Sequence, residues 1–431
     1  MANITFLCPP LTGHITPLHK LATYLKQDGH SIAFVHFFEK YPFDNEFDLY
    51  PIKNNFKEIV SGTELNYSKV YDLKESYLRF FESVYHETLE TCKTIETDLF
   101  VIDHFFQIGS LIADELFTSY LYAYSTPDPF MIEFPDSTTP PIDKIDFIVR
   151  KKGFESFKNL AVTIFGKPIE LYPLSPTGNI CFSTETITFN EERDARFGLL
   201  TSICDHKIYP VSFIGPFLNE SPITENDEML KNEIKSFQGR KIFISFGTVW
   251  TNLIQLKDME EKLTTIIRNV LEALTTPDTL FVYSGSKKIL DQVLNQSPAN
   301  FNLIHRDFLH QSYLLDAFDL AVFHGGYNSF VECVTNSVPM LCVPMGWDQG
   351  NIAKIILEQN LGDRINLSHH SQEEIKVKAE KVIHSPQVKE NLRNIAKDFS
   401  QHNGEKLGCL VIEKCLEKIH KTDVLSTNHV H

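Results

Sequence analysis

The sequence of 431 residues contains eight cysteines but lacks any Cys-x-x-Cys pair. Several of these cysteines, such as Cys342 in the run Met340-Leu-Cys-Val343, lie in apolar strand-like segments, so we interpret them as reduced core thiols. The amino terminus lacks a basic start followed by a long apolar run, and no later segment is apolar enough to span a bilayer. These absences favour a cytoplasmic protein.

Positive charge is also scarce, because 40 Lys and Arg residues face 56 Asp and Glu residues, for a formal net charge of -16. Nucleic acids and anionic membrane surfaces both attract cationic proteins, so this balance argues against either as a partner. An Asp-x-Asp metal motif is missing as well. We therefore expect no bound metal.

The length exceeds that of a usual single domain. Strand and helix signals alternate in residues 1–213 and again in 239–400, which predicts an α/β protein with two doubly wound, Rossmann-like domains. A polar connection is expected at 214–238, where Glu225, Asp227 and Glu228 form an acidic run, and a terminal helix and tail at 401–431.

Predicted strands of the first domain span 4–8, 31–38, 98–103 and 120–124. Its first helix is predicted to begin at Pro17, which suits the first helical position, and to end at Gly29. Ligands of open α/β sheets bind beyond the carboxyl ends of the strands, so we expect the site there. In the second domain, predicted strands span 241–246, 279–283, 301–305, 319–323 and 339–343, and the last predicted helices span 387–400 and 404–420.

The segment Phe323-His-Gly-Gly-Tyr-Asn-Ser-Phe-Val-Glu332 is the most informative part of the chain. Its two glycines follow a predicted buried strand and allow the backbone to approach a ligand closely. Asn328 or Ser329 is expected to open a helix, and the N–H groups and partial positive charge of a helix start suit a phosphate. His324, Asn328 and Ser329 can add hydrogen bonds. The pattern indicates a site for an anionic, hydroxyl-rich ligand.

Together with the run from Pro344 to Asn351, Pro-Met-Gly-Trp-Asp-Gln-Gly-Asn, this segment resembles the donor-binding signature of the UDP-glycosyltransferase superfamily. These enzymes transfer sugars to small lipophilic molecules. The resemblance implies the GT-B fold, with the ligand in a cleft between two domains and the terminal helix crossing back to the first. It also implies a UDP-sugar co-substrate and no cofactor.

Sugar transfer to an alcohol needs a base, and His14 in Gly13-His14-Ile-Thr-Pro17 follows the first predicted strand. Asp103 closes another predicted strand of the same sheet, so its carboxylate can hold the imidazole in the manner of a catalytic triad. The family's catalytic His and Asp correspond by position to His14 and Asp103. His19 and His104 are alternative bases, and helix capping or a turn is the structural alternative.

The resemblance assigns further roles in the second domain. Glu332 would hold the ribose hydroxyls, although its spacing from Ser329 is also that of a capping box. Asp348 and Gln349 would bind the sugar together with Trp347, with a helix cap as the alternative for either polar residue. The proposed diphosphate contacts are Ser245, Gly247, Thr248, His324, Gly326, Asn328 and Ser329.

The segment Phe308-Leu-His-Gln311 departs from the family pattern, because His310 stands where a proline is usual. Phe308 would stack on the uracil, the backbone of Leu309 would bond the edge of the base, and Gln311 would reach the ribose. The departure leaves the choice between uridine and thymidine open.

We therefore expect an inverting, metal-independent transferase that moves a hexose, with glucose as the first hypothesis, from a UDP-sugar to a hydroxyl of a lipophilic small molecule. A hydroxylated isoprenoid is one acceptor hypothesis, because the opening also looks like that of carotenoid glucosyltransferases. The alternatives are a UDP-GlcNAc-using GT-B transferase or epimerase, and a non-catalytic nucleotide-sugar-binding protein. Aromatic residues that could line the acceptor pocket, or form plain core, are Phe105, Phe106, Tyr122, Phe130 and Phe134.

Overall fold

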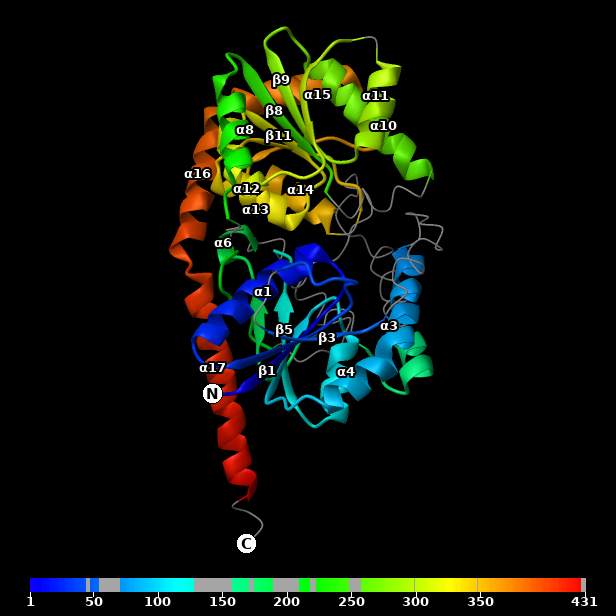
Figure 1. Ribbon diagram of the computed structural model, residues 1–431, viewed down its shortest axis with the longest axis vertical. Helices are drawn as coiled ribbons and strands as arrows, with labels where there is room; N and C mark the ends of the chain where they lie inside the picture. Colours follow the sequence, from blue (N-terminus) through cyan, green and yellow to red (C-terminus); the bar gives the residue numbers. More distant parts are fainter. Residues whose placement is uncertain are drawn as a thin grey trace. The chain divides into compact units, whose positions relative to one another are not determined.

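The computed structural model describes residues 1–43, 47–53, 70–127, 157–169, 174–188, 209–217, 222–247, 257–297, 299–346 and 348–427. The chain divides into two compact units (Figure 1). Unit 1 comprises Met1–Ile132, Thr138–Phe217 and His402–His431, and unit 2 comprises Glu133–Ser137 and Leu218–Gln401. None of the described helices is long and apolar enough to cross a membrane.

Unit 1 is built on a parallel sheet of seven strands in its described residues, in the order β3-β2-β1-β4-β5-β6-β7. The strands are β1 (Asn3–Cys8), β2 (Ser31–His36), β3 (Asp48–Pro51), β4 (Leu99–Asp103), β5 (Ser119–Tyr124), β6 (Asn179–Cys181) and β7 (Ser212–Phe213). Helices of this unit include α1 (Thr12–Gln27), α3 (Val70–Lys93), α4 (Ile108–Glu115), α6 (Glu185–Thr188) and α17 (Gly404–Thr427).

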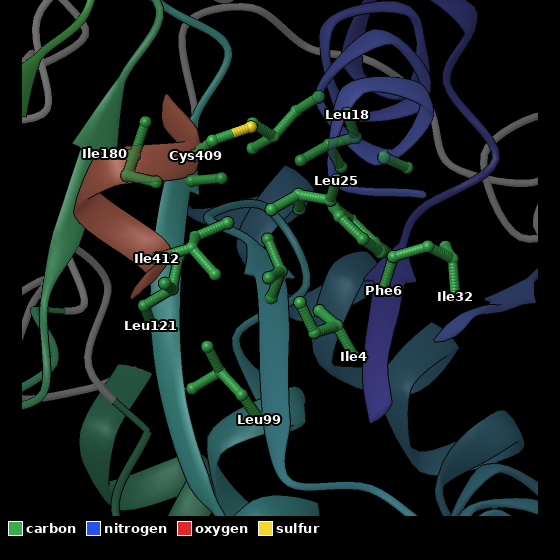
Figure 2. Packing of buried hydrophobic residues seen from close by; sticks show 14 of the residues in the cluster. Ile4, Phe6, Leu18, Leu25, Ile32, Leu99, Leu121, Ile180, Cys409 and Ile412 are labelled. Carbon is green, nitrogen blue, oxygen red and sulfur yellow. The ribbon is translucent and has the colours of Figure 1, made fainter. Parts of the chain in front are cut away.

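Both faces of this sheet are buried, as is usual for a parallel sheet. On one face, Leu18 and Leu25 of α1 and Ile412 of α17 pack over strand residues such as Phe6 and Leu121 (Figure 2). The other face packs against α3 and α4, and carries the alternate strand residues. The terminal helix lies close to α1, because a Cβ at Gly408 would be only 2.7 Å from Leu21 Cδ1.

Unit 2 has a second parallel sheet, in which the described strands follow the order β10-β9-β8-β11-β12-β13. Its strands are β8 (Arg240–Ser245), β9 (Thr279–Ser284), β10 (Asn302–Arg306), β11 (Leu320–Phe323), β12 (Met340–Cys342) and β13 (Gly362–Arg364). Its helices are α8 (Glu225–Ser236), α10 (Lys257–Leu274), α11 (Lys287–Gln296), α12 (Gln311–Leu314), the 3-10 helix η1 (Leu315–Ala317), α13 (Tyr327–Thr335), α14 (Gln349–Glu358), α15 (Gln372–Ile383) and α16 (Pro386–Gln401). The order of both sheets is that of a doubly wound fold, which confirms the predicted α/β class.

One predicted boundary was wrong in a way that affects the site. Helix α1 begins at Thr12, five residues before Pro17, which lies inside the helix. The amides of His14 and Ile15 already bond the carbonyl of Leu11, at 3.0 and 3.1 Å, and these bonds start the helix. His14 therefore sits in the first turn of α1 rather than in a loop. The acidic run at Glu225, Asp227 and Glu228 likewise forms the first turn of a helix, α8.

Candidate functional site

In unit 1, the central strands β1 and β4 lie side by side, and the chain leaves β1 toward β2 but leaves β4 toward β5. Such a reversal opens a crevice beyond the carboxyl ends of the two strands, where doubly wound proteins bind ligands. His14 lies in the first turn of α1 after β1, and Asp103 is the last residue of β4. Ser125 follows the end of the next strand, β5. The topology thus brings these side chains to one sheet edge.

The imidazole of His14 is held by this group. Its Nδ1 lies 3.0 Å from Asp103 Oδ1, 3.1 Å from Asp103 Oδ2 and 2.6 Å from Ser125 Oγ. The Ser125 hydroxyl donates to Asp103 Oδ2 at 3.1 Å, so toward His14 it presents a lone pair. Because three acceptor oxygens surround Nδ1, this nitrogen carries the proton. The basic lone pair of the neutral imidazole is therefore on Nε2.

Asp103 is fully buried, and its carboxylate depends on its neighbours for compensation. Burial alone would raise the pKa of this carboxyl group. The charge and hydrogen bond of His14, together with His104 and the backbone N–H of Phe105 at 2.9 Å from Oδ1, outweigh burial and lower the pKa. The carboxylate is therefore ionised and can stabilise a protonated His14.

The alternative bases have different surroundings. His104 Nδ1 lies 3.8 Å from Asp103 Oδ1, beyond hydrogen-bond distance, and burial lowers the pKa of His104 to about 4. His19 Nδ1 bonds Tyr41 Oη at 3.0 Å within a cluster of aromatic rings, and burial lowers its pKa to about 4. Both rings are neutral at pH 7, and neither bonds Asp103, so the geometry favours His14.

The same cluster is the place where a metal ion could be held. Ligand atoms of His14, Asp103 and His104 all lie within 4.8 Å of one another. A metal ion bound at Nδ1 of His14 would replace the proton that this nitrogen shares with Asp103. Metal binding at this nitrogen and its hydrogen bond to Asp103 are thus mutually exclusive.

The aromatic residues near this edge separate into two groups. Phe105 contacts the His14 ring edge-on, with centroids 4.6 Å apart, so it can contribute to an acceptor surface. Phe106 and Tyr122 are fully buried in the core on the α3 and α4 side, so the structural alternative applies to them. Phe130 and Phe134 lie outside the described residues.

In unit 2 the same reversal of strand connections occurs between β8 and β11. Ser245 ends β8 and is buried, and His324 follows β11. The His324 ring lies between two glycines, since a Cβ at Gly247 would be 2.7 Å from its Cε1 and a Cβ at Gly326 2.5 Å from its Nε2. Burial lowers the pKa of His324 to about 4, despite a hydrogen bond with the backbone of Ser245. The ring is neutral at pH 7.

Helix α13 begins at Tyr327, one residue earlier than the first predicted start, and its N-cap is Gly326 without a side-chain cap. Ser329 therefore lies inside the first turn and is not the N-cap, so the capping-box alternative for Glu332 was wrong. Asn328 is exposed, and Ser329 and Glu332 are half-buried. The first turn of a nine-residue helix thus follows directly on the glycine pair.

Gln349 begins helix α14, with Asp348 at the N-cap position but without a side-chain cap bond. Gln349 is buried, and its Oε1 accepts from the backbone N–H of Met345 at 2.8 Å, a bond that holds the turn between β12 and α14. Gly325 packs against this turn, since its Cβ would be 3.1 Å from the Gln349 carbonyl oxygen. The turn thus lies beside the glycine pair. Thr248 and Trp347 lie outside the described residues.

Phe308 lies in the loop between β10 and α12, and its side chain is 77% exposed, whereas Leu309 beside it is buried. Among the described residues of unit 2, three side-chain nitrogens are shielded from solvent and lack a hydrogen-bond partner: Gln311 Nε2, His324 Nδ1 and Asn351 Nδ2. Buried polar atoms normally have partners, so a polar ligand bound here would satisfy these nitrogens.

Sequence reasoning missed two residues of this arrangement, Ser125 and Asn351. The signal for Ser125 was available, since it follows a predicted strand of the same sheet as Asp103 does. Asn351 ends the run from Pro344 that resembles the donor-binding signature, but no role was assigned to it.

Comparison with known proteins agrees with this geometry. Residues 219–403 match the family model described as UDP-glucoronosyl and UDP-glucosyl transferase. The protein named uncharacterized UDP-glucosyltransferase YojK, of Bacillus subtilis (strain 168), is 24% identical over 439 residues, which cover 94% of this chain and 95% of the relative. The zeaxanthin glucosyltransferase of Pantoea ananas is 20% identical, over 84% of each chain.

Among solved structures, the spinosyn rhamnosyltransferase SpnG complexed with thymidine diphosphate superposes with a TM-score of 0.64 at 12% identity, covering 93% of this chain and 96% of that one. The chain thus has the fold of a known glycosyltransferase. Full-length similarity to a UDP-glucosyltransferase, the family match in unit 2 and the sheet topology agree with one another. Residues 219–403 thus form a domain of the UDP-glucoronosyl and UDP-glucosyl transferase family, and the chain is a glycosyltransferase with the GT-B fold.

Proposed function

We propose that this enzyme transfers a hexose, with glucose as the first candidate, from a UDP-sugar to a hydroxyl group of a lipophilic small molecule with inversion at the anomeric carbon. The observation that carries the proposal is the arrangement of His14, Asp103 and Ser125 at the carboxyl edge of β1, β4 and β5. Nucleotide-sugar binding alone would need neither a buried carboxylate nor an imidazole oriented by it.

The proposed reaction is a single displacement. Nε2 of His14 accepts the proton of the acceptor hydroxyl while its oxygen forms a bond to the anomeric carbon. The bond between that carbon and the β-phosphate oxygen breaks, and UDP leaves with the electron pair. Asp103 stabilises the imidazolium, and Ser125 keeps the carboxylate and ring aligned. Because attack and departure take place on opposite faces of the sugar, an α-linked donor gives a β-glycoside.

Departure of UDP places negative charge on the β-phosphate. The start of α13 provides backbone N–H groups and the positive end of a helix dipole. His324, which follows β11 beside this helix start, is proposed as a further phosphate contact. Ser245, Gly247, Gly326, Asn328 and Ser329 complete the proposed phosphate site, and Thr248 is proposed with them. These groups would act in place of a metal ion, so we propose that no cofactor is required.

The remaining donor contacts are proposed from the same loops. Glu332 lies in the second turn of α13 and would accept the ribose hydroxyls, and Gln311 Nε2 is a buried donor that a ribose oxygen would satisfy. Phe308 would stack on the base, with the backbone of Leu309 at its edge. Asp348, Gln349 and Trp347 would bind the sugar. Uridine is proposed because the matched family model is named for UDP-sugars.

For the acceptor we propose a hydroxylated isoprenoid as the first class to test. Two observations support it: the zeaxanthin glucosyltransferase is similar over 84% of both chains, and Phe105 offers an aromatic surface directly against the His14 ring. A ring or polyene beside Phe105 would bring its hydroxyl toward the base.

The test uses purified protein, UDP-glucose and a panel of hydroxylated lipophilic acceptors. His14→Ala should lower turnover by a factor of roughly 100 to 10,000, while the dissociation constant of UDP stays within twofold of wild type. His370→Ala, which changes a histidine of unit 2 on the α15 side, is the matched control and should keep full activity. Near wild-type turnover in His14→Ala would refute the proposed base. A parallel assay of His104→Ala shows whether that residue replaces it.

A further inference from the structure

The loop that carries Phe308 presents an unusual combination of side chains. The Phe308 ring is 77% exposed, whereas His310, two residues on, is only 9% exposed. An exposed ring can stack on a base only if the backbone below it is held in one position. A restraint on this backbone matters for binding if the loop has the base-binding role proposed above.

His310 contacts helix α8, which precedes β8 in the chain. Its Nδ1 lies 3.7 Å from Asp227 Oδ2. The same carboxylate oxygen accepts hydrogen bonds from the Thr224 backbone N–H at 2.9 Å and the Thr224 hydroxyl at 2.7 Å. The first of these bonds and the bond from the Asp227 N–H to Thr224 Oγ1 at 3.2 Å form the capping box of α8. Asp227 is therefore fixed by the helix cap, and His310 packs against a carboxylate that does not depend on it for orientation.

A second set of contacts joins α8 to the residues that follow His310 in the chain. Lys231, one turn further along α8, donates to the Tyr313 carbonyl oxygen at 2.6 Å and forms an ion pair with Asp316 at 2.7 Å. Its ammonium group also lies 4.0 Å from the centroid of the Tyr313 ring. Hydrogen bonds connect His310 to the backbone of the short helix α12: the N–H groups of Tyr313 and Leu314 donate to the His310 carbonyl oxygen.

The backbone of His310 has φ -74°, within the range that proline imposes. Proline would restrain this position by its ring, whereas histidine leaves φ free to change and needs an outside contact to achieve the same restraint. We propose that His310 is a positioning residue, which Asp227 of α8 holds in place so that the loop presents Phe308 to the nucleotide base. The contact between Asp227 and His310 thus takes the place of a covalent restraint.

The test compares binding of UDP and of pyrophosphate, which lacks the base, by calorimetry, together with kcat and KM for the donor. His310→Ala and Asp227→Asn should each weaken UDP binding and raise the donor KM by roughly five- to tenfold, with kcat within twofold, and should leave pyrophosphate binding unchanged. His310→Pro should restore UDP affinity to within about twofold of wild type, because it restores the backbone restraint. The double variant His310→Ala/Asp227→Asn should be no worse than either single variant. Glu228→Gln, an exposed acidic residue in the same turn of α8, is the matched control and should bind both ligands normally.

Several outcomes would overturn the inference. UDP affinity equal to wild type in His310→Ala would do so, as would an equal loss for UDP and pyrophosphate, which would indicate general damage to unit 2. Failure of His310→Pro to restore binding at an unchanged melting temperature would also contradict it. Phe308→Ala distinguishes the proposed base site from the positioning role of His310. If Phe308→Ala binds UDP normally, the proposed base site itself is wrong. If it weakens UDP while His310→Ala does not, only the positioning role is wrong.

Discussion

Replacing Asp103 by asparagine is the sharpest perturbation of the proposed base. Asp103 Oδ1 accepts from the Phe105 N–H at 2.9 Å and Oδ2 accepts from the Ser125 hydroxyl at 3.1 Å. An asparagine must put its NH₂ group at one of these positions. The Phe105 amide is a fixed donor, so the NH₂ group will turn toward Ser125, whose hydroxyl can rotate.

This rotation changes the proton on His14. Once Ser125 Oγ accepts from the asparagine NH₂, its own hydrogen points toward His14 Nδ1, which is 2.6 Å away. A donor at Nδ1 favours the tautomer with the proton on Nε2, and that tautomer cannot accept the acceptor's proton. The variant also loses one charge-assisted hydrogen bond, worth about 1.5 to 3 kcal/mol, which corresponds to a roughly 10- to 150-fold loss in kcat.

Initial rates of glycoside formation from UDP-glucose test this reasoning, with UDP affinity and melting temperature measured on the same preparations. Asp103→Asn should lose kcat by that factor and keep UDP affinity, because the change lies in unit 1. Adding Ser125→Ala to Asp103→Asn should recover part of the loss, since the donor that favours the wrong tautomer is removed. Wild-type turnover in Asp103→Asn would refute the orienting role. A double variant slower than Asp103→Asn would refute the tautomer argument.

Three further predictions concern the donor side and the chemistry. Glu332→Ala should weaken UDP and UDP-glucose alike by a factor of roughly 10 to 100, since a charged hydrogen bond to ribose is lost, and calorimetry that shows normal UDP binding would contradict the assignment. The product formed from an α-linked donor should be a β-glycoside by NMR, and activity should survive excess EDTA; an α-linked product or a requirement for Mg²⁺ or Mn²⁺ would contradict the single metal-free displacement. Burial lowers the pKa of His324 from 6.5 to about 4, so between these pH values the unfolded chain binds more protons than the folded chain. The melting temperature of unit 2 should therefore fall as the pH drops from 6.5 to about 4. His324→Gln should show a shallower pH dependence, and an unchanged slope would mean that this histidine is already protonated in the folded protein.

The sequence predicted the central strands of both sheets because their apolar runs are uninterrupted, as in β4 with Leu-Phe-Val-Ile and β11 with Leu-Ala-Val-Phe. It did not predict β3, β6, β7 or β13, which are two to four residues long and lie at or near the edges of the sheets. Such short strands depend on a neighbour already in place, so they leave little local pattern. The start of α1 was missed for a related reason, because Pro17 is a strong local signal for a helix start and the structure tolerates it inside the helix.

The sequence predicted the donor side of the candidate site more completely than the base side. The donor side is formed by one continuous stretch, in which a strand, two glycines and a helix start follow each other within ten residues. The features that favour phosphate binding are therefore close together in the sequence and can be recognised there. The base side is assembled from three segments, at His14, Asp103 and Ser125, which are 89 and 22 residues apart along the chain. Only the parallel order of β1, β4 and β5 brings them together.

That difference explains why Ser125 was missed while Asp103 was found. An aspartate at a strand end attracts notice because a buried carboxylate needs a partner, whereas a serine in the same position costs little when it is unpaired. The place of Ser125 after a predicted strand was visible in the sequence, but only the structure shows that its hydroxyl donates to the carboxylate and faces the imidazole at the same time. Its role follows from the direction of hydrogen bonds, which residue type alone does not determine, and the paired variants of Asp103 and Ser125 measure that direction.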